Sequence, residues 1–348
     1  MERQGDRIRA IGLVSGGLDS LLAVSLLKGR GLELLGLHFY NGFSPGSLKR
    51  VIRDEGTQED FLGAQARKLS VLLGITVEVI DVSGEFLDLI VSPRHGYGAN
   101  VNPCIDCRIF MLQRARERME REGAHFIFTG EVLGQRPMSQ HRRAMDLVAR
   151  RSGLEGCLLR PLSAKLLPPT VPEEKGWIER DSLLDIQGRS RKRQMALALE
   201  FGLREYEQPA GGCTLTDENY ARRFKDLMRY RERPAIHRED AVLLAAGRHF
   251  RLSGRLKIIV GRDETENRFL ERNGVGAWLL TAMDHPGPSV LVQGEPDGEE
   301  LRRTAEITAR YSDAKHLPTV RVAARRGDEN RILEVAPISD SSLERLRI

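Results

Sequence analysis

The stretch "GLVSGGLDSLLA", residues 12–23, joins a short apolar run to a helical pattern through two adjacent glycines. The run that leads into it, "IRAIGLV" at residues 8–14, predicts a buried strand, and the residues after the glycines have the apolar spacing of a helix. Glycines let a backbone approach a phosphate closely, and the N–H groups of the turn and of the helix N-terminus favour an anion. The stretch therefore predicts a phosphate-binding loop, made by Ser15, Gly16, Gly17, Asp19 and Ser20.

Strands and helices continue to alternate after this loop. Four more apolar runs predict strands, at residues 32–40, 75–83, 125–131 and 157–163, and helical patterns separate them. Such alternation is typical of a parallel sheet with helices on its faces. We therefore expect an α/β fold, with a doubly wound parallel sheet as its main element.

Composition shifts divide the chain into three expected domains. The sheet domain covers residues 1–165 and ends at the proline-rich "LLPPTVPEEKG". A smaller helical and basic segment follows at 166–240, and an α+β domain with its own strands and helices occupies 241–348. A chain of 348 residues is long enough for each of these parts to bury a core.

Composition also indicates the cellular compartment of the protein. Hydrophobic residues make up 41% of the chain and charged residues 30%. Because the N-terminal residues contain no long apolar stretch and no later run approaches 18 apolar residues, we expect neither a signal peptide nor a membrane span. We therefore expect a cytoplasmic protein without a membrane partner. Because the cytoplasm keeps thiols reduced, the four cysteines do not predict a disulfide framework.

Positive charge is concentrated in the middle of the chain. Residues 108–204 contain 19 Lys and Arg against 12 Asp and Glu, a net charge of +7. Such a tract predicts contact with a nucleic-acid backbone, although solvated helix faces with i,i+4 partners give the same composition. The expected RNA-binding residues are Arg142, Arg143, Arg189, Arg191, Lys192 and Arg193.

Three of the four cysteines are candidates for chemistry. Cys104 and Cys107 lie in "NPCIDC", and Cys213 follows two glycines in "EQPAGGCTLTD". Three thiolates are one short of a structural zinc site, which His95 or His141 would have to complete. A redox pair, a persulfide that is resolved as a disulfide, and a metal cluster held by three thiolates also remain open. Cys157 opens an apolar strand and is expected to be a core thiol.

The ends of the predicted strands supply the rest of the expected nucleotide site, because ligands bind outside the carboxyl ends of strands in open α/β sheets. His38 and Phe39 end the second strand, and Thr129 and Gly130 end the fourth. His38 and Phe39 have an equally good explanation as packing residues. Asp19 next to a polyphosphate implies Mg²⁺, although a carboxylate also stabilises a helix N-terminus.

"SGGLDS" resembles the pyrophosphate loop of the PP-loop, or N-type, ATP pyrophosphatases, which cleave ATP between the α- and β-phosphates and adenylate a substrate. The segments "HGYGANVNPCIDCRIFML", "TGEVLGQRPMSQ", "DIQGRSRKRQ" and "PAGGCTLTD" resemble one subgroup of tRNA sulfurtransferases, or thiouridine synthases. This resemblance covers residues 8–230. Family members with a sulfur-transfer role often have a histidine where Glu131 stands here, which leaves the function of Glu131 open.

The resemblance implies an ATP-dependent tRNA thiolation. A base carbonyl is adenylated, and sulfur from sulfide or a persulfide carrier then displaces AMP. Likeness to the iron–sulfur-dependent members implies a [4Fe-4S] cluster on Cys104, Cys107 and Cys213, and Asp19 joins these cysteines as an expected catalytic residue. A persulfide mechanism and a small-molecule ligase or amidotransferase are the alternatives. The last hundred residues, with "KIIVGRDETENRFL" and "HPGPSVLV", are similar to the NFACT-R module, a predicted RNA-binding domain.

Overall fold

The computed structural model describes residues 7–206, 213–232 and 235–348. The chain forms two compact units. The first unit contains Met1–Gly42 and Gly56–Gly212, and the second contains Phe43–Glu55 and Cys213–Ile348. The residues expected to form a separate helical segment, 166–240, are thus divided between the two units at residue 213.

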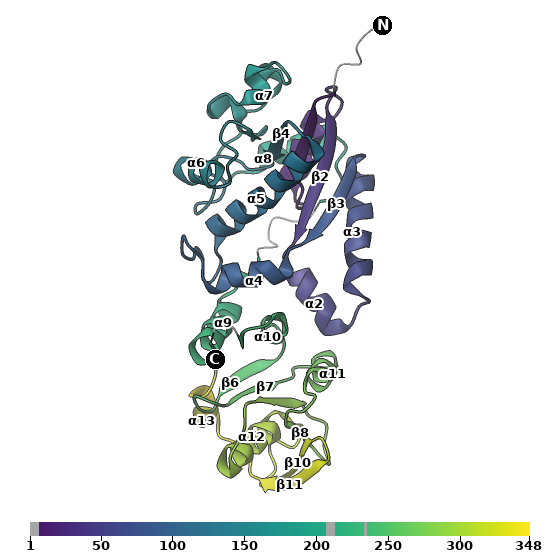
Figure 1. Cartoon of the computed structure of the whole chain (residues 1–348). Helices are drawn as coiled ribbons and strands as arrows, with labels where there is room; N and C mark the ends of the chain where they lie inside the picture. Colours follow the sequence, from purple (N-terminus) through teal and green to yellow (C-terminus); the bar gives the residue numbers. More distant parts are fainter. Residues whose placement is uncertain (1–6, 207–212, 233–234) are drawn as a thin grey trace. The chain divides into compact units, whose positions relative to one another are not determined.

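The first unit is built around a parallel sheet of five strands in the order β3-β2-β1-β4-β5 (Figure 1). β1 is central, and its register aligns Leu13 with Leu37 of β2 and with Thr129 of β4. The predicted α/β fold with a doubly wound parallel sheet is therefore confirmed. The strands are β1 (Arg9–Leu13), β2 (Glu33–Tyr40), β3 (Thr76–Asp81), β4 (Phe126–Thr129) and β5 (Leu158–Leu159).

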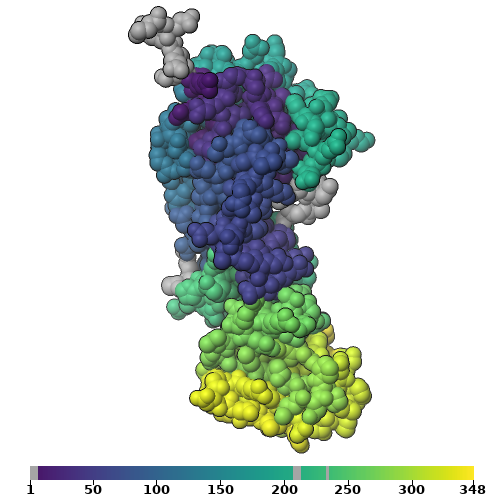
Figure 2. Space-filling model, turned by 90° about the vertical axis from the view of Figure 1, so that its right-hand side faces the viewer, coloured from purple at the N-terminus to yellow at the C-terminus, as the bar shows by residue number. Residues whose placement is uncertain are grey.

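Helices cover both faces of this sheet because successive strand residues point to opposite sides. Ala10 and Val14 join a buried cluster with α1 (Leu18–Leu27), α3 (Gln58–Leu73) and α8 (Lys192–Glu200). Ile11 and Leu13 join a cluster on the other face, with α5 (Cys104–Glu122) and α6 (Arg142–Arg151). Figure 2 shows the surface of the first unit on the side where the blue helix α3 lies.

Shorter elements complete the first unit. They are α4 (Ser83–Val91), α7 (Val171–Glu174) and the 3₁₀ turns η1 (Ala164–Leu166) and η2 (Arg180–Ser182). No helix in the described ranges has the length and apolar character needed to cross a membrane.

The second unit contains a six-stranded antiparallel sheet in the order β11-β10-β8-β9-β7-β6. Helix α12 (Gly298–Tyr311) contributes Leu301, Ala305 and Ile307 to the core over this sheet. The strands are β6 (Arg248–Arg251), β7 (Lys257–Val260), β8 (Leu279–Ala282), β9 (Val290–Gln293), β10 (Val320–Arg326) and β11 (Glu329–Val335). The other helical elements are η3 (Thr214–Thr216), α9 (Glu218–Tyr230), α10 (Arg238–Leu243), α11 (Glu264–Asn273) and α13 (Asp340–Glu344).

A segment from the N-terminal part of the chain also belongs to the second unit. Helix α2 (Pro45–Arg53) follows β2 and packs against α10 and α11. Arg272 of α11 pairs with Asp54 and donates to the carbonyl oxygen of Ile52. The amide of Thr214 donates to the carbonyl oxygen of Phe43 at 3.0 Å. The chain therefore leaves the first unit after β2 and returns to it for α3.

Candidate active site

The carboxyl ends of β1 and β4 define the candidate site. These strands are neighbours, and the connections from them run to opposite faces of the sheet, to α1 on one side and α6 on the other. This is the switch point at which open α/β sheets bind their ligands. The "SGGLDS" loop follows β1, and the segment 130–140 follows β4.

The loop after β1 is held by the Ser20 hydroxyl. Ser20 Oγ accepts from the amide of Ser15 at 3.2 Å and donates to the carbonyl oxygen of Gly17 at 2.8 Å. Gly16 has a φ of +83°, a backbone conformation that favours glycine. Gly17, the N-cap of α1, makes no side-chain cap, and the amide of Ser20 donates to its carbonyl oxygen at 3.0 Å. The helix amides before Ser20 are therefore the ones left for an anion.

Asp19 lies in the first turn of α1 and connects the loop to two later segments. Its Oδ2 accepts from Gln135 Nε2 at 2.5 Å and lies 3.9 Å from Arg191 Nη2. Its Oδ1 is buried and has no hydrogen-bond partner among the described residues. A buried carboxylate oxygen without a donor, next to a phosphate-binding loop, fits a hard cation such as Mg²⁺.

Gln135 extends this contact toward α8. Gln194, which is fully buried, donates through Nε2 to Gln135 Oε1 at 3.0 Å. Leu133 and Gln187 form a parallel bridge, and the amide of Gly188 donates to the carbonyl oxygen of Leu133. The segment after β4 and the segment before α8 are therefore joined over the loop that follows β1.

Glu131 links three elements. It is buried, with Oε1 3.1 Å from Arg108 Nε of α5 and Oε2 3.0 Å from Arg160 Nε just after β5. Thr129 Oγ1 also donates to Oε2. Burial raises the pKa of Glu131, but the two arginines and the Thr129 hydroxyl outweigh that effect and hold the pKa below its usual value. Glu131 is therefore an ionised carboxylate that ties the cysteine helix to the sheet.

His38 and Phe39 behave differently at the end of β2. His38 Nδ1 forms a 2.8 Å hydrogen bond with the carbonyl oxygen of Val14, directly before the loop that follows β1. Phe39 packs against the cluster under α5. Phe39 is therefore explained as a packing residue. His38 instead contacts the end of β1, next to the expected nucleotide site.

The cysteine pair lies at the N-terminus of the 19-residue helix α5. Cys104 is its first residue, and the amide of Cys107 donates to the carbonyl oxygen of Pro103 at 2.8 Å. Burial raises the pKa of the Cys104 thiol, and the charges of Arg136 and Arg108 oppose this rise. Two arginines from different segments therefore act on the thiol of Cys104.

Asp106, between the two cysteines, holds the loop that precedes α5. Its Oδ2 accepts from the amide of His95 at 2.8 Å, and its Oδ1 lies 2.8 Å from His95 Nδ1. Since both Asp106 oxygens are used in this way, His95 is engaged in fixing the loop. His141, the other histidine considered as a metal ligand, accepts from the amide of Ala144 and caps α6.

The four cysteines are divided between the units. Cys104, Cys107 and Cys157 belong to the first unit, and Cys213 belongs to the second, where it begins the segment Cys213–Ile348. Cys157 packs beside the apolar cluster under α5, in keeping with its expected role as a core thiol. In the described ranges no three or more Cys, His, Asp or Glu side chains are grouped in a way that would hold a metal ion.

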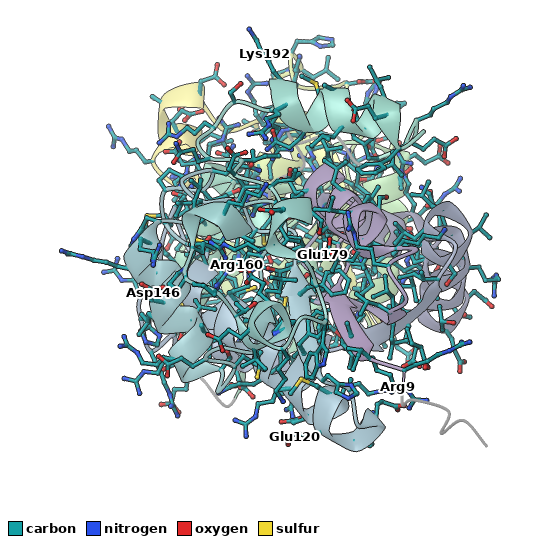
Figure 3. The ribbon with its side chains drawn as sticks, turned by 90° about the horizontal axis from the view of Figure 1, so that it is seen from above. Arg9, Glu120, Asp146, Arg160, Glu179 and Lys192 are labelled. Carbon is teal, nitrogen blue, oxygen red and sulfur yellow. The ribbon has the colours of Figure 1, made fainter. Side chains whose placement is uncertain are left out.

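The expected RNA-binding residues have different surroundings. Arg142 forms an ion pair with Asp146, and Arg193 forms one with Asp185. Arg191 points toward Asp19, whereas Arg143, Arg189 and Lys192 are exposed. Figure 3 labels Lys192 at the edge of the view and Arg160, which is buried, toward its middle.

Sequence reasoning did not identify four polar residues of the site, namely Arg108, Gln135, Arg136 and Gln194. A signal was present in "TGEVLGQRPMSQ", where polar residues follow a buried strand at its carboxyl end. Arg108 and Gln194 carried no such signal because both lie within ordinary helical patterns. Their roles depend on partners that are remote in sequence.

Two protein-family models match separate parts of the chain. Residues 8–146 match the tRNA methyl transferase HUP domain. Residues 247–347 match the NFACT protein RNA binding domain. The first part of the chain is therefore similar to a tRNA methyl transferase HUP domain and the last part to an NFACT RNA binding domain, which confirms the NFACT-R resemblance.

Curated relatives match over about a third of their length. The tRNA-specific 2-thiouridylase MnmA of Syntrophotalea carbinolica is 32% identical over 125 residues, which cover 34% of this chain and 32% of that protein. The protein of the same name from Kineococcus radiotolerans is 35% identical over 103 residues, 29% of this chain and 28% of its own. The protein of the same name from Mycobacterium tuberculosis is 29% identical over 103 residues, which cover 29% of this chain and 28% of that protein.

Two solved structures show a weaker likeness. A 4-thiouridine synthetase in complex with RNA and bound ATP is 22% identical, with a TM-score of 0.33, and the match covers 60% of this chain and 47% of that one. The C-terminal part of a fibronectin/fibrinogen-binding protein from Streptococcus suis is 16% identical, with a TM-score of 0.28, over 82% of this chain and 99% of that one.

Proposed function

We propose that this protein is an enzyme that thiolates a base of tRNA at the expense of ATP, in the cytoplasm. The observation that carries the proposal is that a phosphate-binding loop and an arginine-flanked cysteine pair belong to one unit and are connected by the segment after β4. The matched HUP domain, the 2-thiouridylase relatives and the RNA-binding domain support a tRNA substrate.

The nucleotide is assigned to the carboxyl ends of β1 and β4. The free amides at the start of α1 take the β- and γ-phosphates, and Asp19 Oδ1 supplies a ligand for Mg²⁺. Bound there, Mg²⁺ would neutralise charge on the leaving pyrophosphate. His38 is assigned to the adenine side, whereas Phe39 packs in the cluster under α5, and Thr129 and Gly130 close the loop from the β4 side.

The first chemical step is adenylation. The carbonyl oxygen of the base attacks the α-phosphorus, and the bond to pyrophosphate breaks with its electron pair on the leaving oxygen. Adenylation is needed because a carbonyl oxygen is otherwise a very poor leaving group. The amides of the loop and of α1 favour pyrophosphate as its charge develops.

The second step transfers sulfur. A sulfur nucleophile supplied as sulfide or as a persulfide by a carrier attacks the adenylated carbon, and AMP leaves. With a persulfide on one cysteine of the Cys104–Cys107 pair, the other thiolate resolves the intermediate as a disulfide and releases the thiocarbonyl. An external dithiol then reduces the disulfide for the next turnover.

A [4Fe-4S] cluster is the other form that the sulfur site could take. The first unit supplies only two of the three thiolates, so Cys213 of the second unit would have to be the third ligand. When bound, an open iron of the cluster would deliver sulfide. None of the steps above depends on the cluster, and iron analysis separates the two forms.

The RNA is held by exposed basic groups of the first unit and by the NFACT-type domain. Arg143, Arg189 and Lys192 are the exposed members of the basic set, and Arg142 and Arg193 can exchange their carboxylate partners for phosphates. Such contacts position the RNA without selecting its sequence.

The proposal is tested with purified protein, ATP, Mg²⁺, a sulfide donor and a tRNA transcript. We expect RNA-dependent release of pyrophosphate and a thionucleoside detected by mass spectrometry. Asp19→Ala abolishes both products, whereas Glu59→Ala, an exposed carboxylate in the first turn of α3, leaves them unchanged. Pyrophosphate release without RNA and without a thionucleoside would instead favour a small-molecule ligase.

A further inference from the structure

We propose that Arg136 is a substrate-binding residue that holds the α-phosphate of the nucleotide and directs the adenylated base toward Cys104. This inference rests on the function proposed above and adds to it a residue that links adenylation with sulfur transfer. Arg136 lies in the segment 130–140, between the residue that contacts Asp19 and the residue that contacts the loop before the cysteines.

The segment 130–140 is fixed on both sides of Arg136. Directly before it, Gln135 donates to Asp19. Two residues after it, Met138 lies against Gly98, so that a Cβ added at Gly98 would be 3.4 Å from Met138 Cγ. The carbonyl oxygen of Arg136 accepts from the amide of Gln140 at 2.9 Å. The backbone of Arg136 is therefore held between the phosphate loop and the cysteine loop.

The charges around Arg136 favour an anion. Its guanidinium interacts electrostatically with Asp19 and the Cys104 thiol, and also with Arg108 and Arg191. In the part of the chain that the structure describes, its side chain makes no hydrogen bond or ion pair, whereas Arg108 is paired with Glu131. The Arg136 residue is exposed to solvent, but partial desolvation of its guanidinium and the charges of Arg108 and Arg191 lower its pKa. A phosphate would relieve this excess of positive charge.

A guanidinium is well suited to this ligand. Its planar fork donates two parallel hydrogen bonds to two oxygens of one phosphate, which an ammonium group cannot do. In the proposed site, the loop amides and the helix N-terminus bind the β- and γ-phosphates. The α-phosphate, which remains on the substrate after pyrophosphate leaves, is the group assigned to Arg136.

The assignment gives Arg136 a particular part in sulfur transfer. When sulfur attacks the base, the carbon–oxygen bond breaks and its electron pair leaves on a phosphate oxygen of AMP. Arg136 neutralises that phosphate, and its charge also attracts the sulfur nucleophile at Cys104 to the same place. Loss of Arg136 should therefore impair the second step more than the first.

The test compares Arg136→Gln and Arg136→Lys with the wild type, with Arg150→Gln as a matched control on an exposed arginine of α6. The first measurement is the dissociation constant for AMP, which requires no thiolation. We expect Arg136→Gln to weaken AMP binding by about tenfold to a hundredfold, as for loss of a charge-assisted pair. Arg136→Lys should retain part of the affinity, and Arg150→Gln all of it.

The second measurement is the ratio of pyrophosphate released to thionucleoside formed. We expect this ratio to rise about tenfold in Arg136→Gln, because adenylated base is lost to water before sulfur reaches it, and less in Arg136→Lys. Unchanged AMP affinity and an unchanged ratio would overturn the assignment. An equal loss of AMP affinity in Arg136→Gln and Arg136→Lys, together with a lowered melting temperature in both, would also overturn the assignment and indicate a structural role. A wild type that binds AMP but forms no thionucleoside would reject the proposed function while the AMP measurement still decides the role of Arg136.

Discussion

Gly130 packs directly on the backbone of Asp19. A Cβ at residue 130 would lie 2.4 Å from both the carbonyl carbon and the carbonyl oxygen of Asp19, and 2.5 Å from the amide nitrogen of Ser20. These are backbone atoms, which cannot move aside as the end of a flexible side chain can. The end of β4 and the start of α1 can therefore pack this closely only because residue 130 has no side chain.

Gly130→Ala should push the first turn of α1 away from β4. We expect a loss of about 1–3 kcal/mol in the free energy of unfolding, which is usual for overpacking, and weaker ATP binding. Gly84→Ala in α4 is the matched control, because a Cβ there meets nothing within 4 Å. Chemical denaturation and nucleotide titration measure both effects, and wild-type ATP affinity in Gly130→Ala would contradict this account.

Glu131→Gln should destabilise the first unit by about 3–5 kcal/mol, because Arg108 and Arg160 lose their buried charge partner. The folded state holds the pKa of Glu131 below its usual value. The contribution of Glu131 to the free energy of unfolding is therefore fully present above the pKa that this carboxyl has in the unfolded chain. It is lost as the pH falls through the lower pKa of the folded state. Urea denaturation at several pH values measures this difference. Glu117→Gln, an exposed carboxylate of α5, should show neither effect.

Lys257→Met should stabilise the second unit at neutral pH. The Lys257 side chain is buried, and its Nζ has no hydrogen-bond partner among the described residues, although it lies 3.9 Å from Asp226 Oδ2, which Arg251 also holds. Burial lowers the pKa of Lys257 to about 7. Between pH 7 and the pKa of Lys257 in the unfolded chain, the unfolded chain binds more protons than the folded protein. The free energy of unfolding of the wild type therefore rises with pH in this range, by at most about 1.4 kcal/mol per pH unit. The Met variant should lack this slope, and the same slope in both proteins would contradict the prediction.

Lys192→Glu together with Arg189→Glu should weaken tRNA binding, because both side chains are exposed and close to α8. The loss should shrink as salt is raised, since phosphate contacts act through counterion release. Filter binding at several salt concentrations checks this, with Lys68→Glu on α3 as the control. If affinity for tRNA does not depend on salt in the wild type, these residues form only a solvated face.

Iron analysis decides the form of the sulfur site. If Cys104, Cys107 and Cys213 hold a cluster, anaerobically reconstituted protein should be brown and contain about four irons per chain. Alanine at any of the three should remove the iron, and Cys157→Ala should keep it. Stoichiometric zinc would exclude the cluster. Colourless, metal-free protein that thiolates tRNA and accumulates a persulfide on one of these cysteines would establish the disulfide route.

Local patterns predicted the sheet of the first unit because its strands are short apolar runs that alternate with helices. The position of the loop Ser15–Ser20 between β1 and α1 was predictable for the same reason, and its phosphate-binding role remains a prediction. The connections of Glu131 were not predictable, because Arg108 and Arg160 are 23 and 29 positions away and either could have faced solvent. The three-cysteine arrangement remains a prediction.

Helix α2 was missed although the sequence contained its signal. Ser44 is an N-cap that accepts from the amide of Ser47, and Pro45 occupies the first turn, both typical of a helix start. The membership of α2 in the second unit had no local signal. It depends on contacts such as that between Asp54 and Arg272, which are 218 positions apart.

The excursion at Phe43–Glu55 means that the polypeptide passes between the two units three times, after residues 42, 55 and 212. Termination at residue 212 would strip α2 of its partners and expose Leu48 and Ile52, which are buried in the whole protein. A fragment that starts at residue 213 would lack the acceptor of the Thr214 amide. Each half would therefore lose packing or hydrogen-bond partners that the other half supplies, and we expect the two units to fold together in the whole chain.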